Sequence, residues 1–297
     1  MAALPDPPVC LVTGASTGIG RACAVRLSEK GWRVWASMRD LAKADKLHDM
    51  AAAAGVKPGL VELDVVDDAS VRRAVEEVTA AAGRIDVLVN NAGVGGNGVT
   101  EECSIEQYQQ VMDANVYGAI RCIQAVLPQM RARRSGAIVN ITSITGRIAA
   151  IAQSPYYVSK WAAEALTEGL AQELAPFGIR VAALEPGITK SAIFAKNKDA
   201  PNDTGAYDAH YRRLFQFYAA GIPDATPAEE VAELVHHAVT TDAPKLRYSC
   251  SWGGRELLEG RARMSDEEWV ALGAIESDAE YYDTFSDAFG VDIRPRS

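Results

Sequence analysis

A tyrosine and a lysine four residues apart are the clearest candidates for chemistry in this chain. Tyr156 and Lys160 lie in a segment with helical periodicity, 155–177, and residues four apart share one face of a helix. A tyrosine hydroxyl ordinarily has a pKa near ~10, and a nearby ammonium group favours its ionised form. Tyr156 can therefore give or take a proton. Tyr157 is the rival base, but the residue four positions after it is Trp161, which carries no cation.

Two further polar residues could assist this pair. Ser143 follows the predicted strand 136–142, where its hydroxyl could hydrogen-bond a substrate oxygen. Thr142 is the rival hydroxyl, although strand alternation places neighbouring side chains on opposite faces. Asn115 lies inside the predicted helix 105–133, where asparagine is a poor helix former. It is either a functional residue or a plain polar surface position.

A glycine-rich turn follows the first predicted strand and opens a helix. The segment reads Thr13-Gly14-Ala15-Ser16-Thr17-Gly18-Ile19-Gly20. Glycines permit a tight turn and a close approach to a pyrophosphate, and the helix N-terminus supplies N–H groups for its charge. This context predicts a dinucleotide site rather than an ordinary glycine turn. The candidate contacts are Gly14, Ser16, Thr17, Gly18, Ile19 and Gly20.

The end of the second predicted strand, 33–38, indicates which dinucleotide binds. Sites for NAD carry an acidic residue here, which accepts a hydrogen bond from the ribose 2′-hydroxyl. In this chain Arg39 stands at the strand end and could form charge-assisted bonds with a 2′-phosphate. The sequence therefore favours NADP(H). NAD(H) is the alternative if Arg39 is a solvated charge and Asp40 turns inward.

Short β-rich runs alternate with helical stretches over the first 184 residues. The predicted strands cover 9–13, 33–38, 59–64, 86–90, 136–142 and 180–184, and the predicted helices 19–30, 43–53, 69–82, 105–133 and 155–177. Nearly continuous runs of Val, Ile, Leu and Ala are typical of parallel strands covered on both faces. The alternation predicts an α/β fold with a Rossmann-like, doubly wound parallel sheet, which binds ligands at the carboxyl ends of its strands.

Residues at the ends of three predicted strands are suited to cofactor contacts. They are Asp64 and Val65 after the third strand, Asn90, Ala92 and Gly93 after the fourth, and Pro186, Gly187, Ile188 and Thr189 after the sixth. Small residues after the fourth strand would let the backbone approach the adenine-ribose side. We expect backbone groups after the sixth strand to grip the nicotinamide. Asp64 could instead only cap a turn, and Tyr156 and Lys160 complete the contacts.

The predicted domain covers residues 1–263 and is followed by an acidic extension. Residues 187–225 hold six aromatic residues among Pro, Gly, Asn and Asp, a composition that predicts a substrate lid. A helix beginning near residue 227 and a strand at 246–251 are expected to finish the core. Residues 264–297 carry nine acidic residues against two arginines, a net charge of −7. Aromatic residues in this extension predict helices that pack on the domain.

Composition and charge exclude several classes of function. The chain has 30 basic and 39 acidic residues, and its net charge of −9 argues against a nucleic-acid partner. No run approaches ~18 apolar residues, and the first residues do not form a secretory signal. We therefore expect no membrane span and a cytoplasmic protein. The five cysteines are scattered and include no CxxC, so neither disulfides nor a metal site are expected.

These motifs together resemble the short-chain dehydrogenase/reductase family, in its compact single-domain branch. The shared motifs are TGxxxGIG at 13–20, NNAG at 90–93, Asn115, Ser143, YxxxK at 156–160 and Pro-Gly at 186–187, within roughly residues 8–190. The resemblance implies that Asn115 kinks its helix and holds a water that joins Lys160 to bulk solvent. It also implies a homodimer or homotetramer built on the helices 105–133 and 155–177. Arg39 and Arg247-Tyr248 resemble the 17β-hydroxysteroid and retinol dehydrogenase group.

The expected function is that of an NADP(H)-dependent oxidoreductase that interconverts a bulky apolar secondary alcohol and its ketone, of steroid, retinoid or aromatic type. The expected pocket residues are Tyr211, Phe215 and Tyr218 on the lid, and Val94, Ile144 and Ile148 on the opposite wall. One alternative is a small or carboxylate-bearing ketone, with Arg147 as the partner of the acid. A non-catalytic nucleotide sensor would be expected to have a broken YxxxK. The glycine spacing disfavours a sugar-nucleotide epimerase or dehydratase.

Overall fold

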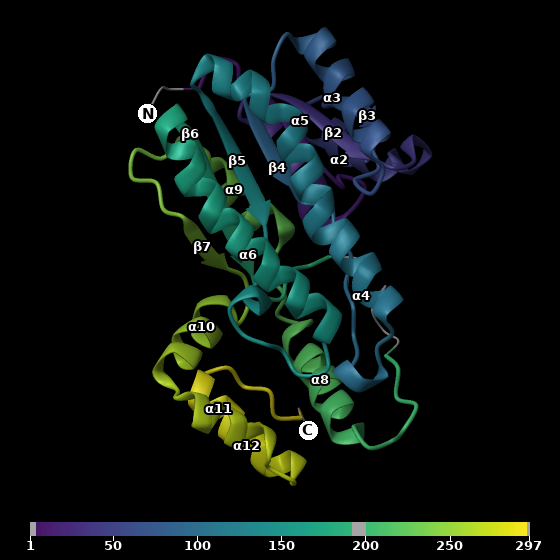
Figure 1. The fold of residues 1–297 in the computed structure, drawn as a ribbon, viewed down its shortest axis with the longest axis vertical. Helices are drawn as coiled ribbons and strands as arrows, with labels where there is room; N and C mark the ends of the chain where they lie inside the picture. The colour runs from purple at the N-terminus through teal and green to yellow at the C-terminus, as the bar shows by residue number, and fades with distance from the viewer. Residues whose placement is uncertain (1–3, 192–199, 296–297) are drawn as a thin grey trace.

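The computed structural model describes residues 4–191 and 200–295, which build an open parallel sheet with helices on both faces (Figure 1). The strands are β1 (Val9–Val12), β2 (Arg33–Met38), β3 (Gly59–Glu62), β4 (Val87–Asn90), β5 (Gly136–Ile141), β6 (Ile179–Pro186) and β7 (Arg247–Cys250). Their spatial order is β3-β2-β1-β4-β5-β6-β7. The chain reverses direction across the sheet between β1 and β4, the position at which a doubly wound sheet places its ligand crevice.

Helices cover both faces of this sheet and extend beyond the carboxyl ends of its strands. They are α1 (Gly18–Glu29), α2 (Asp45–Ala53), α3 (Asp68–Ala82), α4 (Ile105–Met112), α5 (Gly118–Arg133), α6 (Ser154–Leu174), α8 (Asp208–Gly221), α9 (Ala228–Thr240), α10 (Gly254–Arg263), α11 (Asp266–Gly273) and α12 (Asp278–Phe289). Alternate residues of β1 enter two apolar cores: Cys10 and Val12 pack with α1, α2 and α9, while Val9 and Leu11 pack with α3, α5 and α6. Burial on both faces explains why the strands are apolar throughout.

The single helix expected over 105–133 is interrupted in the structure. A π-helical turn, Asp113–Tyr117, separates α4 from α5. Within it, the Asn115 side chain accepts a hydrogen bond from the Val94 N–H at 2.8 Å and donates one to the Val94 carbonyl at 2.9 Å. These bonds tie the helix to the chain that follows β4. The extra residue of a π-turn places Asn115 at the carboxyl edge of the sheet, and such turns are frequent at functional sites.

The helices α8, α10, α11 and α12 gather beyond the carboxyl ends of the strands, in the lower part of Figure 1. Arg213 of α8 is buried and connects α8 to α12. Its Nε lies 3.0 Å from the Asp278 carboxylate, and its guanidinium carbon lies 4.3 Å from the centre of the Tyr281 ring. Side chains from these helices form one apolar cluster with Ile144 and Ile148, which follow β5. The acidic C-terminal segment is therefore packed beside the strand ends.

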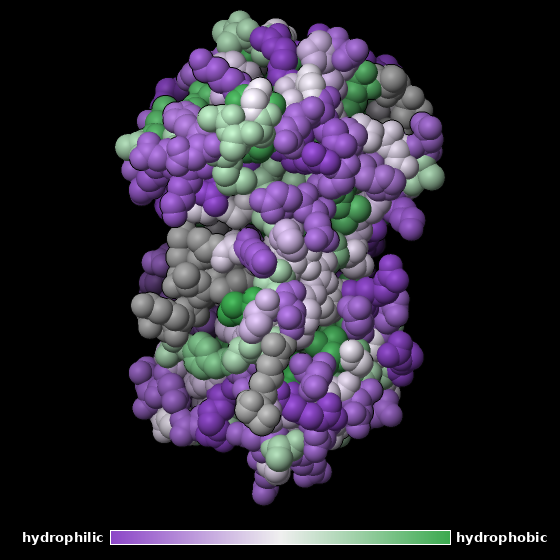
Figure 2. Space-filling view, turned by 180° about the vertical axis from the view of Figure 1, so that it is seen from behind, coloured by the Kyte–Doolittle hydropathy of each residue, from purple (hydrophilic) through white to green (hydrophobic). Residues whose placement is uncertain are grey.

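The predicted Rossmann-like fold in a single domain is confirmed by the sheet order and its two helical layers. Most predicted elements are present with ends shifted by a few residues, as β6 shows by continuing to Pro186. Hydrophilic residues cover most of the face seen in Figure 2, and hydrophobic ones form small separate patches in its upper part and its middle. Within the described part of the chain, no helix is long and apolar enough to span a membrane.

Candidate active site

The structure brings Tyr156, Lys160 and Ser143 together at the carboxyl end of β5. Tyr156 and Lys160 lie on one face of the first turns of α6, and the Lys160 Nζ is 5.5 Å from the centre of the Tyr156 ring. The Ser143 hydroxyl is hydrogen-bonded to the Tyr156 hydroxyl and lies 3.4 Å from the Pro186 carbonyl. Lys160 donates to the Ile141 carbonyl at 3.0 Å, which fixes its ammonium group under the tyrosine. The arrangement can donate a proton to an oxygen bound above Ser143.

Burial shifts the pKa values of both ionisable groups toward their neutral forms. It raises the pKa of Tyr156 to about 12, and the hydrogen bond with Ser143 acts in the opposite direction. It lowers the pKa of Lys160 to about 8, and the charge of Glu164 acts in the opposite direction. In the protein alone, Tyr156 is therefore protonated near neutral pH. Burial is the largest effect on Tyr156 here, and the expectation that the Lys160 ammonium and an oxidised nicotinamide together favour the phenolate stays a prediction for the cofactor-bound protein.

The rival side chains are engaged elsewhere. The Tyr157 hydroxyl accepts a hydrogen bond from Ser154 at 3.1 Å, and Tyr108 contacts the same serine at 2.5 Å. Thr142 donates its hydroxyl proton to the Leu184 carbonyl at 2.8 Å, within the sheet. Neither group faces the space above Ser143, so the geometry favours Tyr156 as the acid or base.

A small cavity of about 10 Å³ lies behind Lys160. It is lined mainly by residues of the predicted site and their neighbours, including Thr13, Val65, Asn90, Ala92, Asn115, Asn140 and Lys160. Its size suits about one water molecule, and the polar lining supplies partners for it. The Asn115 amide also donates to the Ser159 hydroxyl at 2.9 Å, next to Lys160 in α6. The cavity can therefore hold a water of the kind that the sequence resemblance implies.

The glycine-rich turn leads from β1 into the N-terminus of α1, as predicted. Gly18 has a φ of +53°, and a Cβ on Gly14 would lie 2.8 Å from the Ala92 Cα, so both positions require glycine. Thr17 makes no side-chain cap to α1, and the first turn of α1 carries no acidic residue. Such a helix end presents N–H groups and positive potential to an anion. This cradle fits the pyrophosphate of a dinucleotide.

Two residues outside the predicted set brace this turn. The Thr13 hydroxyl accepts hydrogen bonds from the N–H groups of Asn91 and Ala92, each at 3.0 Å. The Asn91 amide donates to the carbonyls of Thr13 and Gly14 at 2.9 and 3.1 Å. Asn90 bonds Asn140 across β4 and β5 at 2.9 Å. The paired asparagines at 90–91 were the available sequence signal for this bracing.

The end of β2 presents Arg39 without a competing acid. Asp40 turns away as the cap of a short 3₁₀ turn, accepting from the Ala42 N–H at 3.0 Å and pairing with Lys43 at 3.5 Å. Arg39 is exposed, and the described residues offer it no ion-pair partner. Asp64, which follows β3, accepts a hydrogen bond from the Val66 N–H at 3.2 Å. Its carboxylate therefore caps a turn, which was the alternative to a cofactor contact. An anionic group beside the ribose would therefore meet Arg39.

Two backbone N–H groups after β6 are hydrogen-bonded within the protein. The Gly187 N–H donates to the Cys250 carbonyl at 2.8 Å, and the Ile188 N–H donates to the Trp252 carbonyl at 3.0 Å. The Thr189 hydroxyl is within 2.7 Å of the Ser251 hydroxyl. These two amides are thus bonded by the chain around β7, and the predicted nicotinamide contact falls to other backbone groups of residues 186–189. The sequence could not foresee this pairing, because Trp252 lies 64 residues beyond Ile188.

An apolar cavity of about 320 Å³ is lined from Ile144 onward by the segment that follows Ser143, although Ser143 and Tyr156 themselves do not line it. One wall is the segment that follows this serine, with Ile144, Ile148 and Ile151. The other walls come from α8, α10, α11 and α12, through residues such as Phe217, Leu257, Leu272, Phe285 and Phe289. The cavity therefore depends on the C-terminal helices. Val94, expected on its wall, is 41% exposed and does not line it.

The helix α8 presents a different aromatic face from the predicted one. Tyr211 and Tyr218 are buried, but Phe215 is 37% exposed and lines an outer groove with Tyr282. Phe217 instead lines the apolar cavity and packs on Trp252, with ring centres 5.5 Å apart. The reason is that α8 packs against two neighbours, the loop near residue 99 and α12, which leaves Phe215 outward. Phe194 of the predicted lid lies outside the described residues.

Tyrosine hydroxyls hold α8 against the loop that precedes α4. The Tyr211 hydroxyl accepts from the Val99 N–H at 3.2 Å and donates to Glu102 at 2.7 Å. The Tyr218 hydroxyl is bonded to the Gln153 amide at 2.5 Å, close to Tyr156. The predicted lid helix is thus seated over the candidate site.

Arg147, the expected partner of an acidic substrate, already has a partner. Its Nη1 lies 3.2 Å from Glu185, whose side chain is 1% exposed. A substrate carboxylate would have to compete with this buried acid. Arg213, which does line the apolar cavity, is likewise paired, with Asp278 at 3.0 Å.

Comparison with known proteins agrees with this geometry. Residues 8–202 match the family model described as short chain dehydrogenase. An uncharacterized oxidoreductase of Bacillus subtilis is 34% identical over 89% of this chain and 96% of its own length. The 17-beta-hydroxysteroid dehydrogenase type 1 of Mus musculus is 40% identical over 88% of this chain and 78% of its length. A 3-oxoacyl-[acyl-carrier-protein] reductase of Staphylococcus epidermidis is 39% identical over 61% of this chain and 75% of its length.

Solved structures share the fold. A short-chain dehydrogenase from Streptomyces avermitilis superposes with a TM-score of 0.77 at 34% identity, covering 90% of this chain and all of that one. An actinorhodin polyketide ketoreductase solved with NADPH gives a TM-score of 0.68 at 31% identity, covering 83% and 97%.

Proposed function

We propose that this chain, which belongs to the short-chain dehydrogenase family, is an NADP(H)-dependent oxidoreductase for a bulky apolar secondary alcohol and its ketone. Its relatives are named as dehydrogenases and reductases, so oxidoreduction at a CH–OH group is the family activity. The observation that carries the finer proposal is the apolar cavity of about 320 Å³ lined by Ile144 and the residues that follow Ser143. A hydroxysteroid dehydrogenase among the relatives supports the same substrate class.

The cofactor proposal is based on the two ends of the crevice. The cradle of Gly14, Gly18 and the α1 N-terminus would hold the pyrophosphate. Arg39 would pair with the 2′-phosphate, since Asp40 is turned away to cap its own turn. The ketoreductase solved with NADPH is a precedent within the fold. When bound, the reduced nicotinamide supplies a hydride to the ketone carbon, and its oxidised form accepts one from the alcohol.

The chain's own residues would manage the proton. Ser143 would hold the ketone oxygen through its hydroxyl, and Tyr156, protonated near neutral pH, would give that oxygen its proton. Lys160 would stabilise the phenolate that remains, since its ammonium group lies beneath the ring. The cavity beside Asn115 would pass a replacement proton to Tyr156 by way of Lys160. The same steps run in reverse for alcohol oxidation.

The size of the cavity supports a bulky substrate. Burying about 300 Å² of apolar ligand at ~25 cal/mol per Å² is worth roughly 7 kcal/mol before association costs. A small ketone cannot bury that area. The pairing of Arg147 with Glu185 counts against a substrate recognised by its carboxylate.

A substrate panel tests the proposal. The purified protein is assayed with NADPH and NADH against acetone, a bicyclic aromatic ketone, a retinoid and a steroid ketone. We expect kcat/KM to rise with apolar size and to be higher with NADPH. A preference for small ketones or keto acids would refute the substrate class. Cofactor binding without turnover of any substrate would instead favour a nucleotide-sensing protein.

The oligomeric state is part of the same proposal. Tyr117 and Trp161 are 49% and 48% exposed on neighbouring helical segments, at the surface expected to form a homodimer or homotetramer. Light scattering coupled to size-exclusion chromatography tests this, with Trp161→Glu as the disrupting variant. A monomeric wild type would contradict it.

A further inference from the structure

Two buried acidic residues lie next to the candidate site without belonging to it. Glu164 is one turn after Lys160 in α6 and is 3% exposed, while Glu185 stands just before Pro186 in β6 and is 1% exposed. Burying a carboxylate is costly unless charge partners compensate it. Both carboxylates therefore require cationic partners inside the protein.

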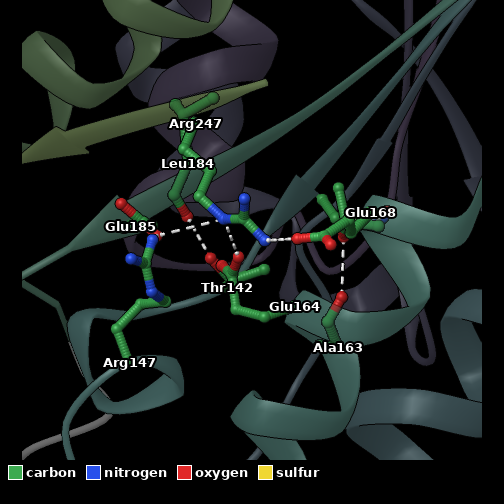
Figure 3. A network of polar contacts seen from close by, with 10 residues as sticks. Thr142, Arg147, Ala163, Glu164, Glu168, Leu184, Glu185 and Arg247 are labelled. Carbon is green, nitrogen blue, oxygen red and sulfur yellow. Dashed lines mark hydrogen bonds and ion pairs between the residues drawn. The ribbon is translucent and has the colours of Figure 1, made fainter. Parts of the chain in front are cut away.

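Arg247 of β7 joins the two acids (Figure 3). Its Nε lies 2.8 Å from the Glu164 carboxylate and 3.8 Å from that of Glu185, while its Nη2 lies 2.6 Å from Glu168. Arg147 bonds Glu185 from the other side at 3.2 Å. This network links α6, β6, β7 and the segment after Ser143, which are the segments that position the candidate catalytic groups.

Glu164 is held close to the turn of α6 that carries Lys160. A Cβ on Gly146 would lie 2.8 Å from the Glu164 Cγ and 2.8 Å from the Lys160 carbonyl, so the chain after Ser143 packs tightly on this turn. Among the described residues, the Glu164 Oε1 is buried without a hydrogen-bond partner. An unpaired carboxylate oxygen of this kind lowers stability. The Glu164 carboxylate is therefore satisfied only in part, through its other oxygen and Arg247.

We propose that Glu164 is a positioning residue that keeps Lys160 in its ammonium form, with Arg247 holding the Glu164 carboxylate in place. The inference rests on the proposed function, because that function assigns a role to the Lys160 ammonium. Burial lowers the pKa of Lys160 to about 8, and the charge of Glu164 opposes this effect. Without it, Lys160 would lose more of its charge near neutral pH, and the Tyr156 phenolate would lose its partner.

The other charged groups around Glu164 do not reverse this expectation. Arg247 is shared among three acids, and Arg147 offsets Glu185. Burial together with the charge of Glu164 raises the pKa of Glu185. Removing the Glu164 charge leaves Arg247 less compensated, and this also disfavours a second cation nearby. Both changes lower the pKa of Lys160.

The first experiment measures the titration of Lys160 without catalysis. Glu164→Gln removes the charge at nearly constant shape, and Glu168→Gln is the matched control, since Glu168 binds the same arginine one turn further along with a side chain 54% exposed. The full-length proteins are labelled with traces of acetic anhydride across a pH series, and acetylation of Lys160 is read by peptide mass spectrometry. We expect the pKa of Lys160 to fall by about half a unit or more, roughly threefold in its protonation ratio, in Glu164→Gln only. An unchanged titration overturns the inference.

The second experiment measures the pH profile of ketone reduction. The alkaline limb of kcat/KM should move to lower pH in Glu164→Gln by the same amount, while Glu168→Gln keeps the wild-type profile. If Glu164→Gln does not fold, Glu164→Met removes the same charge without leaving a buried amide to be satisfied, and it should lower the pKa of Lys160 by a similar amount. If the wild type reduces ketones but the pH profile of Glu164→Gln is not shifted, this inference is overturned and the proposed function is not. Absence of wild-type turnover with every ketone would refute the proposed function, whereas the labelling result would still stand.

Discussion

Phe217→Ala should reduce activity toward bulky ketones far more than toward small ones. The ring lies on the α8 wall of the apolar cavity and contacts Trp252 and Phe285, with ring centres 5.5 and 6.2 Å away. Removing it would return about 40–60 Å² of a large ligand's surface to water. At ~25 cal/mol per Å² this is about 1–1.5 kcal/mol, or roughly five- to tenfold in kcat/KM. Acetone would not reach this wall and should lose little.

Phe215→Ala is the matched control for this prediction. It removes the same ring from the same helix, but Phe215 is 37% exposed on the outer groove. We expect a change of less than about twofold for every ketone. Steady-state kinetics with a steroid-sized ketone and acetone give the selectivity ratio, and melting temperatures show that each variant is folded. Equal losses for large and small ketones in Phe217→Ala, or equal effects of the two variants, would refute the assignment of the cavity.

Three further predictions concern the cofactor and the proton path. Arg39→Ala should weaken NADPH binding by roughly tenfold or more and NADH binding little, measured by fluorescence titration, because only NADPH loses a charge-assisted contact; equal weakening would contradict the NADP(H) preference. Asn115→Ala should lower Tm by a few degrees and kcat by about tenfold or more, because the Val94 N–H and carbonyl and the Ser159 hydroxyl lose their partner; wild-type kcat would exclude a role in proton transfer. The rate of ketone reduction in the wild type should fall as pH rises through about 8, since burial lowers the pKa of Lys160 to that value and the charged form of Lys160 predominates below it. A rate that does not change up to pH 10 would contradict a role for the ammonium.

Local motifs predicted the fold and the residues Ser143, Tyr156 and Lys160 that the structure brings together. The glycine-rich turn and the spacing of Tyr156 and Lys160 are set by short-range geometry: a turn with positive φ and two residues on one helix face. Strand composition was equally informative, because a strand buried on both faces must be apolar throughout. These features need no knowledge of distant contacts.

Long-range packing decided what the sequence could not show. Periodicity placed Tyr211, Phe215 and Tyr218 on one stripe of α8, but the position of α12 determines that Phe217, and not Phe215, enters the cavity. The backbone amides of Gly187 and Ile188 are hydrogen-bonded by the carbonyls of Cys250 and Trp252. These partners are also distant in the sequence, so the pairing could not be predicted from local patterns.

The network around Glu164 was also beyond sequence reasoning. Its members come from separate segments, and Arg247 lies 83 residues after Glu164. The available signal was a glutamate one turn after Lys160, on a helix face that also carries apolar residues. That signal alone does not distinguish a buried acid from a solvated one.

The most direct test of the central claim is a comparison of Tyr156→Phe with Tyr157→Phe. Tyr156→Phe removes only the hydroxyl bonded to Ser143, whereas Tyr157→Phe removes a neighbouring hydroxyl that contacts Ser154. Turnover of a bulky ketone with NADPH and the Kd for NADPH are measured for both. We predict that Tyr156→Phe loses about 100-fold or more in kcat with Kd nearly unchanged, and that Tyr157→Phe stays close to wild type. Tyr156→Phe retaining more than about a tenth of the wild-type kcat would contradict the mechanism.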